Sequence, residues 1–148
     1  MKKEVQDALE MAIAEFETRQ EAEQQRLRER ESFEAEWTKV RTAVVVPALE
    51  EIKALLEKAG WRCEVRPEKE QGVHFTIYRE NMKAGLGAGG SERPYMSFQP
   101  EKSKSTVLVY VATIGSGAGL GGFALDQITE DFVQVEASKF FVRLASGG

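Results

Sequence analysis

Two glycine clusters have the residue spacing of a phosphate-binding motif. Residues 85–90 and residues 117–122 both read G-x-G-x-x-G. In dinucleotide-binding proteins this motif joins a strand to a helix, and the helix N-terminus binds the phosphates. The second cluster lies between a predicted strand and a predicted helix. Gly117, Gly119 and Gly122 are therefore candidates for an anion-binding loop.

The residues around the clusters favour a simpler interpretation. After residue 122 the sequence predicts one helix and no further strand, so it lacks the acidic residue at a second strand end that binds a ribose. Neither cluster has the G-K-[S/T] that completes a P-loop. We expect two connecting loops. Binding of a small ligand, a nucleotide or a phosphate by the loop Gly117–Gly122 is the alternative function.

Cys63 and His74 are the only cysteine and the only histidine of the chain. A thiol nucleophile needs a neighbouring base, and the two residues lie on neighbouring predicted strands. Side chains alternate between the two faces of a strand, which places Cys63 on the apolar face and His74 on the polar one. We therefore predict a buried structural Cys63 and no catalytic residues. One His and one Cys without a metal-ligand spacing also predict no metal site and no cofactor.

A group of aromatic and basic residues near the first glycine cluster is the candidate recognition surface. Aromatic and Arg side chains are enriched at the energetic centres of protein interfaces. The group lies on or beside the polar face of the predicted sheet, and an ordinary solvated face is the competing interpretation. Its members are His74, Tyr78, Arg79, Arg93 and Tyr95.

The elements that carry these residues form an α+β domain. Alternating apolar and polar residues predict strands, and apolar residues at three- and four-residue steps predict helices. The strand over residues 106–114 is apolar on both faces, so we expect both faces to be covered. The expected order is a helix over 47–59, strands over about 61–67, 73–80, 95–100 and 106–114 in a four-stranded antiparallel sheet, and a helix over 125–146.

A charged helical arm over residues 1–46 precedes the domain over residues 47–148. Between Glu15 and Glu36 the arm has no Gly or Pro, and its large apolar residues are too few for a place inside a core. Pro47 marks a kink or a restart of the helix. Apolar residues at helical spacing on both sides of the charged middle predict an interface with another molecule. They are Val5, Leu9, Ile13, Phe16, Leu27, Phe33, Trp37, Val40 and Val44.

Two interpretations of the charged middle stay open. In the first it is a single solvated helix, in which pairs of opposite charge four residues apart contribute about 0.3 kcal/mol each. In the second, Leu27 and the flanking apolar residues form an intermittent coiled coil in a homo-oligomer. At about 1.5 Å per residue, a helix over residues 1–46 would extend about 70 Å. An arm of that length projects from its own domain or crosses to another subunit.

Composition narrows the classes of function. The 148 residues have a net charge of −4 and no dense basic stripe, so binding of nucleic acid is not expected. A lone cysteine fits a reducing compartment, and no apolar run approaches the roughly 18 residues that a membrane helix needs. We expect a cytoplasmic protein that is not an enzyme and contacts no membrane. Its expected partner is a second copy of itself, in a homo-oligomer, or a larger protein.

Overall fold

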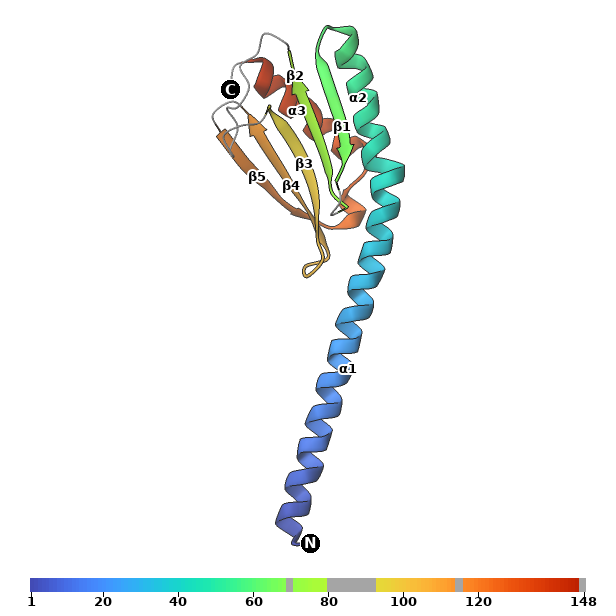
Figure 1. Ribbon diagram of the computed structural model, residues 1–148, viewed down its shortest axis with the longest axis vertical. Helices are drawn as coiled ribbons and strands as arrows, with labels where there is room; N and C mark the ends of the chain where they lie inside the picture. Colours follow the sequence, from blue (N-terminus) through green and yellow to red (C-terminus); the bar gives the residue numbers. More distant parts are fainter. Residues whose placement is uncertain (69–70, 80–92, 114–115, 147–148) are drawn as a thin grey trace.

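The chain has an α+β fold, with a long N-terminal helical segment, a five-stranded antiparallel sheet and a C-terminal helix (Figure 1). The computed structural model describes residues 1–68, 71–79, 93–113 and 116–146. The first part of the helical segment projects far from the sheet, so the N-terminus lies at the distant end of the molecule (Figure 1). The molecule thus consists of a projecting helix and a packed domain.

Three consecutive elements form the helical segment: α1 (Lys3–Val40), a π-helical turn (Arg41–Val45) and α2 (Val46–Lys58). Helical backbone continues from each element into the next. The sequence predicted a kink or a restart at Pro47. The helical backbone does not stop at this residue, so it does not restart, and the segment changes direction between α1 and α2 (Figure 1). The predicted boundary between the arm and the domain helix therefore lies inside one continuous segment (Figure 1).

Pro47 accounts for the π-turn. Proline has no N–H, and inside an α-helix its ring clashes with the carbonyl four residues back. The turn before it is wider, because the N–H of Val46 donates to the carbonyl of Arg41, five residues back. A π-turn adds one residue without ending the helix. The apolar stripe shifts by one position as a result, and Val45 is fully buried while Val44 is only half-buried.

Five strands form one antiparallel sheet in the order of the chain. Their bounds are β1 (Arg62–Pro67), β2 (Val73–Tyr78), β3 (Tyr95–Glu101), β4 (Thr106–Thr113) and β5 (Ser116–Phe123). The first four match the predicted strands, but the prediction of a four-stranded sheet was wrong. Half of the residues of β5 are glycine, which is depleted in strands and gives no alternating pattern. The strand was therefore hidden in the sequence.

The core lies between the sheet and the helices α2 and α3 (Glu130–Ala145). In Figure 1, α3 crosses behind the sheet and α2 runs beside β1. Val107, Val109 and Val111 of β4 point into this core and are buried, whereas Leu108 and Tyr110 on the opposite face are half-buried. The largest fully buried side chains are those of Trp37, Phe75, Phe98, Leu49, Ile77 and Met96.

Helix α3 begins later than the sequence predicted. A short 3-10 turn (Leu125–Gln127) comes first. The Thr129 hydroxyl then accepts a hydrogen bond from the Phe132 N–H at 3.1 Å. This bond satisfies one of the free N–H groups in the first turn, which is the usual role of a threonine at an N-cap. The helix start is thus fixed at Glu130.

Helix α1 has two parts with different surroundings. Residues 3–32 are all exposed, whereas the side chains of Phe33 and Trp37 are only 5% and 0% exposed and belong to the core. The Trp37 Nε1–H donates to the carbonyl of Gln71 at 2.6 Å, in the connection between β1 and β2. The domain thereby anchors the end of α1 and sets the direction of its free part.

Two of the nine residues of the predicted arm interface, Phe33 and Trp37, are buried in their own subunit, and two more, Val40 and Val44, are partly buried there. Val40 packs against the core that contains Phe33 and Trp37. Helical spacing places these residues on one stripe but does not say which molecule covers the stripe. The residues that stay free for a partner are Val5, Leu9, Ile13, Phe16 and Leu27.

Candidate functional site

The free part of α1 carries an apolar stripe. Val5, Leu9, Ile13 and Phe16 follow at steps of four, four and three residues, which places them on one side of the helix. Their side chains are between 48% and 57% exposed. We call these four residues the arm stripe. Leu27, which is 54% exposed, lies about three helical turns further along.

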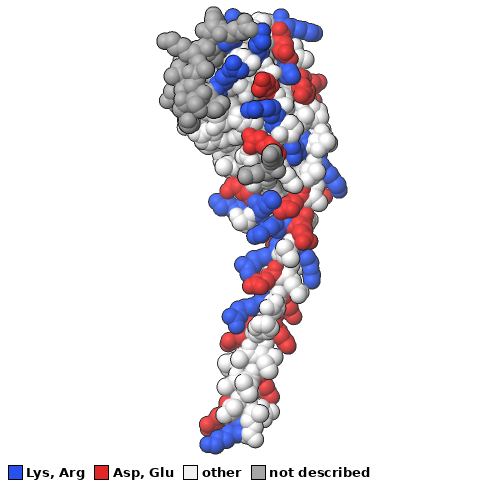
Figure 2. Space-filling view, viewed as in Figure 1, with Lys and Arg blue, Asp and Glu red and all other residues white. Residues whose placement is uncertain are grey.

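The helix between the arm stripe and the domain is highly charged. From Glu17 to Glu31 it has five acidic and four basic residues. Figure 2 shows side chains of both signs mixed along this part, and a larger uncharged area nearer the N-terminus. Gln25 Nε2 donates to Glu29 Oε1 at 3.2 Å across one turn, a type of contact that adds only a few tenths of a kcal/mol. Within its own subunit the charged middle is exposed throughout, which leaves both interpretations of it open.

Four of the five predicted recognition residues gather on the sheet face that points away from α2 and α3. The rings of His74 and Tyr95 stack with centroids 4.3 Å apart. The guanidinium of Arg93 lies 3.7 Å from the centre of the Tyr78 ring. A cation–π contact of this kind contributes about 0.5–1 kcal/mol at an exposed site. These side chains therefore hold one another in place.

Arg79 is the recognition residue that lies elsewhere. Its guanidinium is 4.5 Å from the centre of the Trp61 ring, and its Nη2 donates to the carbonyl of Ala59 at 3.4 Å. Trp61 in turn packs edge-on against Phe141 of α3, with ring centroids 5.0 Å apart. Arg79 thus covers one end of the core on the helix side of the sheet and does not belong to the recognition surface.

The sheet face that points away from α2 and α3 contains further residues that the sequence analysis did not select, and two residues of this face, Thr76 and Ser97, are buried. Glu68 Oε1 lies 3.1 Å from His74 Nδ1, and Glu68 Oε2 accepts a hydrogen bond from Gln99 Nε2 at 3.2 Å. The ring of Tyr110 continues the row, 6.1 Å from that of Tyr95. Tyr110 lies on the face opposite the buried Val109 and Val111, which is where side-chain alternation along β4 puts it. The rings of His74, Tyr95 and Tyr110 thus form a row of side chains in contact across β2, β3 and β4.

Cys63 and His74 lie on opposite faces of the sheet, as predicted. In the register Cys63 pairs with the buried Ile77, whereas His74 pairs with the exposed Arg66. Burial raises the pKa of the Cys63 thiol to about 11, and the nearby Glu57 carboxylate acts in the same direction. A thiol that is protonated at neutral pH and separated from the histidine is not a nucleophile.

The second glycine cluster is a strand, which corrects the predicted loop. Gly117, Gly119 and Gly122 all belong to β5 and pair with residues of β4. Gly121 has a φ of 117°, a conformation that favours glycine. The N-terminus of α3 comes only at Glu130, after the 3-10 turn. The glycine N–H groups therefore lie along a sheet and not at a helix N-terminus, and the first cluster, residues 85–90, lies outside the described residues.

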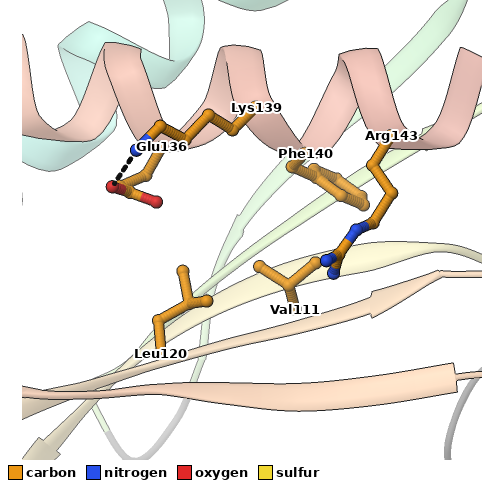
Figure 3. Close-up of a pocket in the computed structure, with 6 residues that line it drawn as sticks. All are labelled: Val111, Leu120, Glu136, Lys139, Phe140 and Arg143. Carbon is orange, nitrogen blue, oxygen red and sulfur yellow. Dashed lines mark hydrogen bonds and ion pairs between the residues drawn. The ribbon is translucent and has the colours of Figure 1, made fainter.

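A pocket between α3 and the strands β4 and β5 was not predicted from the sequence. It has a volume of about 150 Å³. Figure 3 shows Leu120 pointing from β5 toward α3, and Arg143 reaching from α3 toward β4. The floor is apolar and the rim is charged, with an ion pair of 3.4 Å between Lys139 and Glu136. The lining residues are Val111, Leu120, Glu136, Lys139, Phe140 and Arg143.

A wider groove lies where the free part of α1 meets the domain. It has a volume of about 460 Å³ and is open to solvent, and its wall includes Phe33 and Leu125. Three carboxylates, those of Glu29, Glu36 and Asp126, give it a negative charge. Within the described part of the chain, no three His, Cys, Asp or Glu side chains lie close enough together to hold a metal ion.

Comparison with known protein families, with characterised proteins and with solved structures found no match. None of the described helices is both long enough and apolar enough to span a membrane. Three surfaces of the described residues are therefore candidates for a functional site: the arm stripe, the sheet face that points away from α2 and α3, and the pocket between α3 and the strands β4 and β5. Of these, the arm stripe has the largest exposed apolar side chains at regular spacing.

Proposed function

We propose that this protein is a non-enzymatic association module, which binds a second copy of itself or a larger protein through the arm stripe. The observation that supports the proposal is the free helix: residues 3–32 are exposed throughout, yet four large apolar side chains follow one side of it. A helix without tertiary contacts is marginally stable in water. Packing of the stripe against another helix would stabilise it.

The free energy of such packing comes mainly from the stripe. Full burial of one large apolar side chain contributes about 1.5–3 kcal/mol, whereas the exposed charge pairs of the middle contribute a few tenths each. The stripe spans Val5 to Phe16, which is about three helical turns. A second amphipathic helix of similar length would cover it, and the arm of another copy has the required shape and chemistry.

A matched pair of substitutions tests the proposal in the full-length chain. Ile13 lies on the stripe and Met11 does not, because two residues correspond to about 200° around the helix. Both side chains are exposed, 57% and 66%, so neither Ile13→Gln nor Met11→Gln should affect folding. If association buries the stripe, Ile13→Gln should weaken it by about 30-fold, the equivalent of about 2 kcal/mol. Met11→Gln should leave it unchanged.

The measurement is sedimentation equilibrium of the three proteins across a wide concentration range. Equal effects of the two substitutions would contradict a role of the stripe. If the full-length chain stays monomeric, self-association is contradicted. The other form of the proposal, in which the arm stripe binds a larger protein, would then be the one to test. That form of the proposal predicts covalent adducts when a photo-crosslinking residue replaces Ile13 in the cell, and none when it replaces Met11.

A further inference from the structure

We propose a second association surface that does not involve the arm: the edge of β5 and the adjacent side of α3 bind the same surface of a second copy. The two five-stranded sheets would then join edge to edge into one continuous sheet. This inference goes beyond the proposed function, since it rests on different residues at the other side of the domain. Three observations carry it.

The first observation is the contrast between the two edges of the sheet. Strand β1, at one edge, carries Arg62, Glu64 and Arg66 and ends in Pro67, and charged residues and proline are the devices that protect an edge from pairing. Strand β5, at the other edge, has eight residues without charge or proline, seven of them exposed. Apart from the register shift at Leu120, β5 has none of the features that protect an edge, and such an edge presents free backbone groups to another strand.

The second observation is that β5 is complementary to itself. Antiparallel pairing of two β5 strands about a two-fold axis between Gly119 and Leu120 would pair Gly117 with Gly122 and Ala118 with Gly121 of the second copy. Each of these pairs contains glycine, so no side chains collide across the axis. A register shift at β4 leaves Leu120 without a direct partner there, and its side chain points toward α3 (Figure 3).

The third observation is the charge pattern on the side of α3 next to β5. Glu136, Lys139 and Arg143 all line the α3–β5 pocket, together with Leu120. Lys139 pairs with Glu136. The Arg143 guanidinium, in contrast, has no hydrogen-bond or ion-pair partner among the described residues, and only the carbonyl of Arg143 accepts a side-chain hydrogen bond, from Ser146. In the view of Figure 3 the guanidinium lies beside Val111 at one side of the pocket, and the half-exposed Leu120 lies at the other side.

The two-fold axis brings opposite charges together. Rotation about an axis near Leu120 reverses the direction of α3. Glu136 of the first copy then lies opposite Arg143 of the second, and Arg143 of the first copy lies opposite Glu136 of the second. Helix α3 packs on β4, and the two β4 strands of a joined sheet are three strand spacings apart, about 14 Å. Two long side chains can bridge that gap. Both halves of each ion pair occur in one chain, which identifies a second copy as the partner.

Charge exchange tests the arrangement in full-length chains that also carry Ile13→Gln, so that arm association does not interfere. Glu136→Arg alone would place Arg opposite Arg across the axis, and Arg143→Glu alone would place Glu opposite Glu. The parent protein is the chain that carries only Ile13→Gln. Each charge variant should therefore form dimers at least about tenfold more weakly than this parent. A mixture of the two should form heterodimers about as well as the parent forms homodimers, because both cross-axis pairs are restored.

A separate variant tests the strand edge. In Gly119→Lys, the new Cβ would have only Tyr110 nearby, at the normal van der Waals distance of 4.0 Å. The fold should therefore persist, and circular dichroism checks this. The lysine should abolish dimerisation in the Ile13→Gln background. Sedimentation velocity is the readout for all variants. The proposal is overturned if the parent is a monomer, if Gly119→Lys has no effect, or if mixing the two charge variants restores nothing. Failure of the arm proposal would instead appear as equal behaviour of Ile13→Gln and Met11→Gln.

Discussion

Cys63 shows how burial determines the chemistry of a single residue. Its thiol faces the core beside α2 and is buried. Desolvation disfavours the thiolate, and the Glu57 carboxylate adds to this effect, so the pKa of the thiol is raised from 9.0 to about 11. The residue acts in the fold as a small apolar side chain, in agreement with the prediction from strand alternation.

We expect Cys63 to react slowly with an alkylating reagent. At pH 8 a thiol with a pKa of about 11 has about 100-fold less thiolate than one with a pKa of 9.0. The reaction rate of the folded protein should rise about tenfold for each unit of pH, because only the thiolate reacts, and it should level off only near pH 11. Iodoacetamide labelling followed by mass spectrometry measures this rate, with the urea-unfolded protein as the control. Equal rates in the folded and unfolded protein at pH 8 would contradict the burial and the raised pKa of the Cys63 thiol.

At the scale of elements, α1 divides into a free part and a packed part. Two phenylalanines on the same helix mark this division: Phe16 is 56% exposed and Phe33 is 5% exposed. The same substitution should therefore have two different effects. Phe33→Ala should lower the free energy of unfolding by about 3 kcal/mol, because it leaves a cavity beside Trp37 in the core. Phe16→Ala should change it by less than about 0.5 kcal/mol.

Urea unfolding, followed by the fluorescence of the domain tryptophans, measures both effects. It should be done at a protein concentration where the chain is monomeric, since burial of Phe16 in an oligomer would add a concentration-dependent term. A loss for Phe16→Ala that equals the loss for Phe33→Ala in the monomer would mean that the arm folds back on its own domain. The division of α1 at residue 33 would then be wrong.

The elements also show what sequence patterns can and cannot report. Strands β1 to β4 were predicted because alternation records directly which face is buried. Strand β5 was missed because a glycine carries no side chain to alternate. The stripe from Phe33 to Val44 was recognised as a packing surface, but spacing carries no information about which molecule lies on the other side. The pocket of Val111, Leu120 and Phe140 was missed because it is assembled from two strands and a helix that are distant in the sequence.

The π-turn illustrates the same limit within a helix. Pro47 was recognised as incompatible with an ordinary α-helix interior, and two outcomes, a kink or a restart, were considered. The helical backbone continues through Pro47 by way of the π-turn, and the segment changes direction between α1 and α2 (Figure 1). Burial records the added residue, since the buried Trp37 and Val45 are eight residues apart, one more than the seven-residue step from Trp37 to Val44. The sequence could not show this, because residues 44–46 are all valine.

At the scale of the whole molecule, stability should fall steeply along the helical segment. Backbone amides of α2 and of the central strands are buried with the core and exchange hydrogen only through global unfolding. Residues 3–32 are all exposed, and a helix of this length with little tertiary support opens readily. In a dilute, monomeric solution we therefore expect their amides to exchange within seconds, while those of Phe98 and Val109 stay protected by orders of magnitude.

Association should change the rates of amide exchange, and the region in which they change identifies the surface that is in contact. If the arm stripe is buried between two copies, exchange around Leu9 and Ile13 should slow as the protein concentration rises, and exchange in α2 should not change. If the copies join only through β5, protection should instead grow at Ser116–Phe123. Hydrogen exchange with mass spectrometry at two concentrations separates the two surfaces in one experiment. Protection that is independent of concentration in both regions would contradict both, because binding stabilises only the elements that it covers.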